Sequence, residues 1–203
     1  MLIVITHPEI ASGEACAIEA LIEAGATYVH IRKPEATTEQ VSCLVESISP
    51  ASYSALSMHY HHQLAKLFSL GGMHQSKGFI LPDSVGFRYS GGCHSIEELN
   101  ADWEGFNYLF LSPIFDSISK SGYLSGFDAM DISTLMESRA KSAPKLIALG
   151  GVSYNNVDLA YSMGFDGVAL LGGVWDICEG KVNHANTVKR FKQIKLQWES
   201  RCL

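Results

Sequence analysis

Eight short apolar runs alternate along this chain with segments of helical periodicity, and this alternation limits the possible folds more than any other feature. The runs lie at residues 2–5, 27–31, 54–58, 72–74, 87–91, 108–111, 146–149 and 167–171. Strands separated by helical crossovers pair in parallel, and eight strand–helix units close into a barrel. The spacing therefore predicts a (β/α)8 TIM barrel in a single domain over residues 1–203, with a doubly wound open sheet as the rival fold.

Helix boundary signals support this alternation. The first helical segment ends at Gly25, and Thr37 and Gln40 form a capping box before the second segment, which Pro50 closes. Further helices are expected over residues 128–140 and 153–164 and around residues 188–198. A chain of 203 residues is short for eight such units, so at least one unit should be degenerate; residues 75–86 show little periodicity and are the expected place.

Composition narrows the classes of function. A net charge of -6 argues against a duplex nucleic-acid partner, because phosphate neutralisation needs clustered Lys and Arg. The 47% hydrophobic residues can form a buried core, which excludes disorder along the whole chain. No run reaches the roughly 18 apolar residues of a membrane span and no secretory signal is evident, so we expect a cytoplasmic protein without a membrane partner. The 5 Cys lack CxxC spacing and indicate neither disulfides nor a thiolate zinc site.

Two glycine pairs follow the last two apolar runs. Gly150 and Gly151 come after the seventh run, and Gly172 and Gly173 come after the eighth. Barrel active sites form at the carboxyl ends of the strands, and phosphate sites commonly form after strands seven and eight, where backbone N–H groups point at the anion. Tight turns that use glycine for positive φ are the plainer explanation. We favour phosphate binding by these four glycines.

Polar side chains after two other runs also suit an anionic ligand. The loop after the sixth run carries the donors Ser112, Ser117, Ser119 and Lys120. Such hydroxyl and ammonium groups fit phosphate or diphosphate oxygens. Arg32 and Lys33 follow the second run, where paired cations would attract an anion. A solvated loop and an ordinary surface pair are the respective alternatives.

Five histidines stand at or near the ends of apolar runs. They are His30, His59, His61, His74 and His94. His59 and His61 alternate as they would on a strand, which raises the question of a metal cluster. Because there is no HExxH spacing and no evident carboxylate partner, we expect packing or ligand hydrogen bonds at these positions, and no metal site.

His94 has the sharpest pattern among the histidines. It directly precedes Ser95, which forms a capping box with Glu98, so a helix amino terminus should follow it. The helix dipole would keep its imidazole neutral and able to accept a proton near neutral pH. From the residues alone, a histidine packed at a helix entrance explains the pattern equally well.

Taken together, the strand-end residues resemble the thiamine-phosphate synthase and TenI-like family over most of the chain. The segments that carry the resemblance are 30–33 (His-Ile-Arg-Lys for Gln-Leu-Arg-x-Lys), 72–74 (Gly-Met-His for Gly-Val-His), 93–98 (the His-Ser-x-x-Glu segment), 112–120 (Gly-Pro-x-Phe-x-Thr-x-Thr-Lys), 148–152 (Ala-Ile-Gly-Gly-Ile) and 164–171 (Gly-Ala-Asp-Gly-Val-Ala-Val-Val). The resemblance implies a barrel of thiamine biosynthesis that binds a phosphorylated thiazole.

The departures from the family pattern bear on the activity. The synthases are implied to handle diphosphate through Mg²⁺ with an Asn-Asp-Arg on strand three, a nearby Asp, and an Asp after Gly-Val-His. The residues here are His59, Tyr60, His61, Gln63 and Phe79, and the lysine of the second motif falls on Pro34, with Lys33 displaced by one residue. The oxygen ligands that Mg²⁺ prefers are therefore missing.

The resemblance implies two enzymatic activities, and the departures favour one of them. A TenI-like thiazole tautomerase needs one acid–base residue, which falls on His94, and neither metal nor cofactor. The remaining candidates, Arg32, Lys33, His59, His74, Ser112, Ser117, Ser119 and Lys120, are expected to bind substrate. The alternatives are a divergent thiamine-phosphate synthase, which would need Mg²⁺ and a pyrimidine diphosphate as second substrate, and a catalytically silent phosphate-binding or regulatory protein. A homodimer is compatible with each of these functions.

Overall fold

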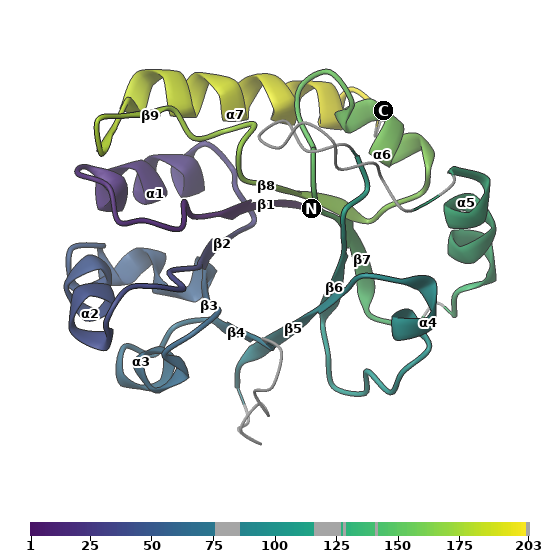
Figure 1. Cartoon of the computed structure of the whole chain (residues 1–203), viewed down its shortest axis with the longest axis horizontal. Coiled ribbons are helices and arrows are strands. Elements are labelled where there is room, and N and C mark those ends of the chain that lie inside the picture. Colours follow the sequence, from purple (N-terminus) through teal and green to yellow (C-terminus); the bar gives the residue numbers. More distant parts are fainter. Residues whose placement is uncertain (76–85, 116–126, 128, 141, 202–203) are drawn as a thin grey trace.

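Eight parallel strands close into a barrel in the computed structural model, which describes residues 1–75, 86–115, 127, 129–140 and 142–201 (Figure 1). The strands are β1 (Leu2–Ile5), β2 (Tyr28–Ile31), β3 (Leu56–Met58), β4 (Gly72–His74), β5 (Arg88–Cys93), β6 (Tyr108–Leu111), β7 (Lys145–Ala148) and β8 (Gly167–Leu170). The first strand pairs with the last, Leu2 opposite Val168. The predicted (β/α)8 barrel is confirmed, and the rival open sheet is wrong because this pairing leaves no sheet edge.

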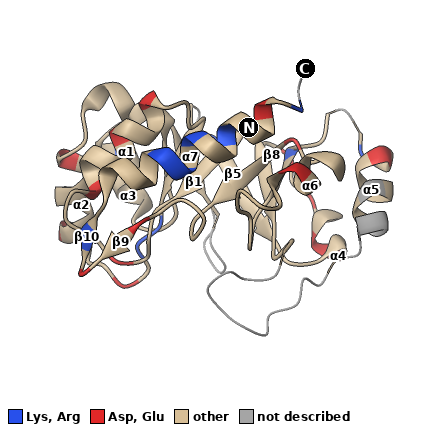
Figure 2. Cartoon of the chain, turned by 90° about the horizontal axis from the view of Figure 1, so that it is seen from above, with Lys and Arg blue, Asp and Glu red and all other residues tan. Residues whose placement is uncertain are grey.

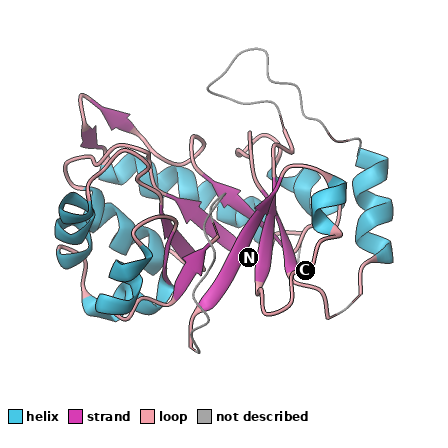
Figure 3. Cartoon of the chain, turned by 60° about the horizontal axis from the view of Figure 1, so that its bottom comes forward, coloured by secondary structure: helices cyan, strands magenta, loops and turns pink. Residues whose placement is uncertain are grey.

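Helices pack around the outside of the barrel (Figure 3), although the described residues include none between β4 and β5. They are α1 (Glu14–Glu23), α2 (Thr38–Glu46), α3 (His62–Leu67), α4 (Ile96–Leu99), α5 (Ala129–Ser138), α6 (Val157–Ser162) and α7 (His184–Glu199). The capping box predicted at Thr37 and Gln40 is present at the start of α2. Three helices are short: α4 spans 4 residues, and α3 and α6 span 6 each. Such short crossovers help eight units fit into this chain.

Several boundaries differ from the sequence-based expectations. A 3-10 helix, η1 (Pro50–Ala55), occupies the start of the third apolar run, with Pro50 in its first turn and Ser49 as its cap. A two-stranded hairpin of β9 (Ile177–Cys178) and β10 (Lys181–Val182), between β8 and α7, was not predicted. The degenerate unit expected at residues 75–86 lies almost entirely outside the described residues.

The barrel interior has an apolar half and a polar half. Alternate residues of β1, β6, β7 and β8 form an apolar cluster of Ile3, Ile5, Tyr108, Phe110, Ile147 and Ala169. The facing residues of β2 to β5 include the polar side chains His30, Ser57, His74, Arg88 and Ser90. Their neighbours in sequence, such as Val29 and Ile31, pack outward in the main core. Because strand side chains alternate, these short strands present polar groups inside and apolar groups to the helices.

Charged residues lie on the helices and also on the loops of the outer surface. Figure 2 shows Lys and Arg positions along α7, in which Lys189 and Lys192 are exposed, Phe191 and Ile194 are buried, and Lys195 donates to the Ala24 oxygen at the end of α1. This amphipathic pattern is the one predicted for the last helix. No helix in the described part of the chain is both long and apolar enough to cross a bilayer.

Candidate active site

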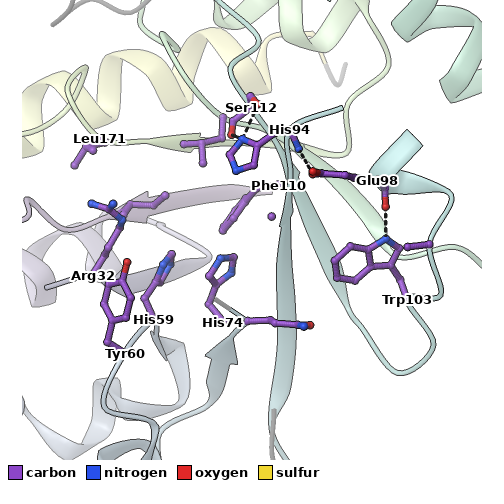
Figure 4. Close-up of a pocket in the computed structure, with 15 residues that line it drawn as sticks. Arg32, His59, Tyr60, His74, His94, Glu98, Trp103, Phe110, Ser112 and Leu171 are labelled. Atoms are coloured by element: carbon purple, nitrogen blue, oxygen red, sulfur yellow. Dashed lines mark hydrogen bonds between the residues drawn. The ribbon is translucent and has the colours of Figure 1, made fainter. Parts of the chain in front are cut away.

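A cavity of about 690 Å³ opens at the carboxyl ends of the barrel strands (Figure 4). Its lining side chains come from the ends of β1 to β8 and from the loops that follow them. They are Ile5, Arg32, His59, Tyr60, His74, Gln75, His94, Glu98, Ala101, Trp103, Phe110, Ser112, Leu149 and Leu171. Five of the candidate side chains from the sequence therefore meet at one cavity: Arg32, His59, His74, His94 and Ser112.

His94 is held at the cavity by the helix that follows it. β5 ends at Cys93, and α4 begins two residues after His94, with the Ser95 side chain accepting from the Glu98 backbone N–H. The Glu98 carboxylate accepts a 2.6 Å hydrogen bond from the backbone N–H of His94. The predicted capping by Ser95 is present, but the return bond reaches His94 rather than Ser95. Glu98 thus fixes the backbone of the candidate catalytic residue.

The ring of His94 is oriented by the loop after β6. Its Nδ1 lies 3.1 Å from the carbonyl oxygen of Ser112 and 3.3 Å from the hydroxyl of the same residue. A carbonyl oxygen only accepts, so in the neutral form of the ring Nδ1 carries the hydrogen and Nε2 holds the lone pair. Since α4 has only 4 residues, this hydrogen bond, more than a helix dipole, selects the tautomer. His94 therefore presents a proton acceptor at the cavity.

An aromatic side chain that sequence reasoning missed forms one wall. Trp103 donates from Nε1 to the backbone oxygen of Glu98 at 3.0 Å, as Figure 4 shows, and packs edge-to-face on Phe106. Glycine is needed at position 91 because a Cβ there would lie 2.5 Å from the Trp103 ring. The sequence shows a glycine at position 91 but does not show which side chain packs against it. It therefore could not predict that Trp103 forms this wall.

Arg32 supplies positive charge to the opposite side of the cavity. Its backbone N–H donates to the Thr6 hydroxyl at 2.9 Å, which ties the loop after β2 to the end of β1. Its guanidinium has no hydrogen-bond or ion-pair partner among the described residues. In Figure 4 the side chain extends beside Tyr60 and His59. An available guanidinium at a cavity wall can bind a carboxylate or a phosphate in a bidentate manner.

Lys33 does not share this role, contrary to the prediction that it binds substrate. It is 1% exposed, and its Nζ lies 2.5 Å from the carboxylate of the buried Glu14. The backbone oxygens of His7 and Glu9 accept from the same ammonium at 2.7 and 2.9 Å. With three acceptors around it, the ammonium ties α1 and the loop before it to the end of β2. Lys33 stands one residue before the lysine position of the family motif. This displacement is consistent with a side chain that bonds to Glu14 instead of lining the cavity.

The two glycine pairs lie on neighbouring loops at the rim of the cavity. Gly150 and Gly151 have φ of 94° and 64°, and a Cβ at Gly150 would lie 2.8 Å from Pro113. A Cβ at Gly173 would lie 2.7 Å from the Val152 oxygen, which shows how closely the loops approach. The cavity itself is lined by the preceding Leu149 and Leu171.

The backbone amides in these loops are open to a ligand. Those of Gly151, Gly172 and Gly173 have no acceptor among the described residues. Adjacent N–H groups without partners can bind an anion, so phosphate binding by the four glycines stays a prediction that this geometry allows. Close packing gives Gly150 and Gly173 a structural reason for being glycine as well.

Three buried imidazoles meet at the floor of the cavity. His30 Nδ1 lies 2.9 Å from His59 Nε2, and the rings of His59 and His74 stack with their centres 4.0 Å apart. Burial lowers the pKa of His30 and His59 well below the usual range and that of His74 to about 3. All three imidazoles are therefore neutral around pH 7, able to donate or accept hydrogen bonds or to bind a metal.

The remaining candidates divide into those outside the cavity and those not described. His61 directly precedes α3 with a φ of 53°; its ring bonds to the Ala36 oxygen and the Thr38 hydroxyl and does not line the cavity. The expected strand alternation of His59 and His61 is wrong because β3 ends at Met58. The candidates outside the described residues are Ser117, Ser119 and Lys120, together with Phe79.

Comparisons with known proteins identify a matching family and similar proteins of known fold. The family model described as thiamine monophosphate synthase matches residues 2–174. A thiamine-phosphate synthase of Prochlorococcus marinus is 26% identical over 184 residues, which are 85% of this chain and 51% of that protein. The chain thus spans about half the length of this curated relative.

Two solved structures extend the comparison. A thiamine phosphate pyrophosphorylase from Bacteroides thetaiotaomicron has a TM-score of 0.82 and 28% identity, covering 98% of this chain and 97% of its own. One from Pyrococcus furiosus has a TM-score of 0.76 and 18% identity, covering 98% and 95%. The second likeness, at this low identity, shows the fold alone.

Proposed function

The chain belongs to the thiamine monophosphate synthase family, and we propose that within this family it is a TenI-like tautomerase acting on a thiazole phosphate carboxylate. The reaction moves a proton from one carbon of the thiazole tautomer to another and makes the ring aromatic. No atom is gained or lost, so one group that accepts and returns a proton is sufficient.

The orientation of His94 is the observation that carries this proposal. With Nδ1–H donated to the Ser112 oxygen, Nε2 is the acceptor available at the cavity. This nitrogen would take the proton from the carbon acid and, as imidazolium, return it at the second carbon. Glu98 holds the backbone of His94 during both steps. A fixed base is efficient because little reorientation is needed before proton transfer.

The anionic groups of such a substrate have candidate partners around the cavity. The Arg32 guanidinium fits the carboxylate or the phosphate, and the amides of Gly151, Gly172 and Gly173 suit a phosphate at the rim. The apolar side chains of Ile5, Leu149 and Leu171, lining the same cavity, suit the thiazole ring. This arrangement supports a small phosphorylated heterocycle as ligand.

The donor set does not fit Mg²⁺, which the resemblance to the synthases implies. Among the described residues that line the cavity, Glu98 is the only carboxylate, and its Oε2 is bonded to the His94 backbone. The other polar side chains that line the cavity after β2 to β4 are the Arg32 guanidinium, the imidazoles of His59 and His74, the Tyr60 hydroxyl and the Gln75 amide. Mg²⁺ prefers carboxylate, carbonyl and water oxygens. The proposed mechanism accordingly includes no step through Mg²⁺.

A divergent thiamine-phosphate synthase is the second candidate. It is favoured by the likeness to the Bacteroides thetaiotaomicron pyrophosphorylase, with 28% identity over nearly the full length of both chains. The missing carboxylates oppose it, since charge on a departing diphosphate needs stabilisation. A phosphate-binding protein without catalysis is the remaining alternative.

Ligand-induced thermal stabilisation separates these candidates. For the tautomerase, the thiazole phosphate carboxylate should raise the melting temperature without Mg²⁺; at 100 times its dissociation constant the stabilisation is about 2.7 kcal/mol. A pyrimidine diphosphate that stabilises only with Mg²⁺, together with synthesis of thiamine phosphate at roughly 1 per second or more, would establish the synthase instead. Stabilisation by the thiazole without turnover would leave only the binding protein.

A further inference from the structure

The buried histidine cluster, defined as His30, His59 and His74, has no part in the proposed proton transfer. Each residue can offer one ring nitrogen such that the three nitrogens lie within 4.8 Å of one another. The residues come from the neighbouring strands β2 and β4 and from the position just after β3. Parallel pairing of β2 with β3, and of β3 with β4, brings these strand ends together. The cluster is therefore a product of the barrel itself.

Hydrogen bonds hold the outer nitrogens of two of these rings. His30 Nε2 lies 2.6 Å from the Tyr108 hydroxyl, and His74 Nδ1 lies 3.0 Å from the Ser90 hydroxyl. When each of these nitrogens donates its hydrogen, His30 Nδ1 and His74 Nε2 keep their lone pairs. His30 Nδ1 faces His59 Nε2. Metal-binding histidines typically donate their second ring nitrogen in this way, which fixes the tautomer and the ring direction.

We propose that the histidine cluster binds one divalent transition-metal ion of the zinc class, with an open coordination position toward the cavity. Three imidazoles suit Zn²⁺, Cu²⁺, Ni²⁺ or Fe²⁺, whereas Mg²⁺ requires oxygen ligands. At Zn–N distances of about 2.1 Å, ligand nitrogens in a tetrahedral site are about 3.4 Å apart. The three nitrogens lie within 4.8 Å of one another, so they would move closer on binding, and the stacked rings of His59 and His74 would turn so that their lone pairs converge on the ion. The hydrogen bond between His30 and His59 would then be replaced by two metal–nitrogen bonds, and the hydrogen now on His59 Nε2 would move to Nδ1 of the same ring, which stays neutral.

The position of the histidine cluster indicates where a fourth ligand of the metal ion would bind. His59 and His74 line the cavity, whereas His30 is fully buried beneath them. Three protein ligands with an open position is the arrangement of catalytic rather than structural zinc sites. An imidazole binds a metal ion in its neutral form, so three such ligands leave the ion's two charges uncompensated, and Arg32 at the cavity adds a further positive charge. The open position therefore favours an anion, either hydroxide or a phosphate or carboxylate oxygen of the cavity ligand.

Binding of Co²⁺, as a spectroscopic substitute for Zn²⁺, tests this proposal without any activity assay. The full chain is stripped with a chelator, dialysed and titrated with Co²⁺ alone. We expect visible ligand-field bands that saturate at about one ion per chain, disappear on addition of Zn²⁺ and persist in a large excess of Mg²⁺. Absence of saturable binding, or displacement by Mg²⁺ as readily as by Zn²⁺, would overturn the proposal.

Variants locate the ion. His59→Gln and His74→Gln should abolish the bands, and Tyr108→Phe, which removes only the hydroxyl beside His30, should weaken binding by about 10- to 100-fold. His184→Gln is the matched control, because His184 bonds to the Gly13 oxygen at the start of α1 and should bind Co²⁺ as the unaltered protein does. Circular dichroism reports whether each variant folds.

A measurement on the unaltered protein keeps the test decisive if the variants unfold. Crystals soaked in Zn²⁺ should show an anomalous peak between the three imidazoles. A peak elsewhere, or Co²⁺ binding unchanged in folded His59→Gln and His74→Gln, would refute the assignment of the cluster. The proposed proton transfer by His94 needs no metal. A negative result for metal binding would therefore not affect the proposed tautomerase activity, and the two proposals are tested independently.

Discussion

At the scale of single residues, His94 depends on two partners for its proposed role. The Ser112 carbonyl selects the tautomer, and the Glu98 carboxylate holds the backbone N–H. The sequence predicted His94 and the cap at Ser95, because capping is a local pattern. It did not predict the carbonyl partner, which lies 18 residues away and is brought near only by the pairing of β5 with β6.

Removing the Glu98 carboxylate should reduce turnover more than substrate binding. We expect Glu98→Ala to lower kcat by about 10- to 100-fold with a smaller change in KM, because a small displacement of a reacting group is costly. Glu97→Ala is the matched control: it removes the adjacent carboxylate of α4, which does not bond to the His94 N–H. Steady-state kinetics of both variants check this, and equal losses would show that Glu98 does not position His94.

Cys93 should resist alkylation in the folded protein. Burial raises the pKa of its thiol to about 12, so at pH 8 roughly one molecule in ten thousand carries the reactive thiolate. Cys16, Cys43 and Cys178 are exposed and serve as internal controls. Iodoacetamide labelling followed by peptide mass spectrometry should find these three modified and Cys93 unmodified until denaturant is added. Labelling of Cys93 at the rate of Cys43 would contradict its buried position.

At the scale of elements, the ion pair of Glu14 and Lys33 joins α1 to the end of β2. Both side chains are almost fully buried, and Glu14 also accepts from the Ala11 N–H. Sequence reasoning assigned Lys33 to the cavity because the residues after a strand usually face the mouth of a barrel. Its actual direction depends on a buried carboxylate 19 residues earlier, and no local pattern predicts such a pairing.

Removing one partner of this pair should destabilise the protein, whereas removing both should cost less. We expect Glu14→Gln to lower the free energy of unfolding by about 3–5 kcal/mol, because it leaves a buried ammonium without its counter-charge. The double variant Glu14→Gln with Lys33→Met should recover part of that loss. Glu23→Gln, on the exposed side of α1, should change little. Urea unfolding of these variants and of Lys33→Met alone checks this, and strictly additive effects of the two single substitutions would contradict the coupling.

At the scale of the whole molecule, the alternation of runs and helices was enough to predict the barrel. Strands such as β1 and β6 were recognisable because they are short, apolar and bounded by turn or cap residues. The polar half of the interior was harder to predict. His30 and Ser57 stand singly between apolar neighbours, and only the closed barrel shows that they face inward together. The β9–β10 hairpin was missed because its two-residue strands carry no periodicity.

Proton exchange in deuterated buffer tests the central claim, that His94 moves a proton on a thiazole phosphate carboxylate. The unaltered protein should aromatise the tautomer and incorporate deuterium at the ring carbon, both well above the rate in buffer. His94→Asn keeps a polar side chain of similar size but removes the acceptor, so turnover should fall by about 10²- to 10⁴-fold while ligand-induced stabilisation persists. His184→Gln should behave as the unaltered protein does. Equal rates for the unaltered protein and His94→Asn would contradict the account.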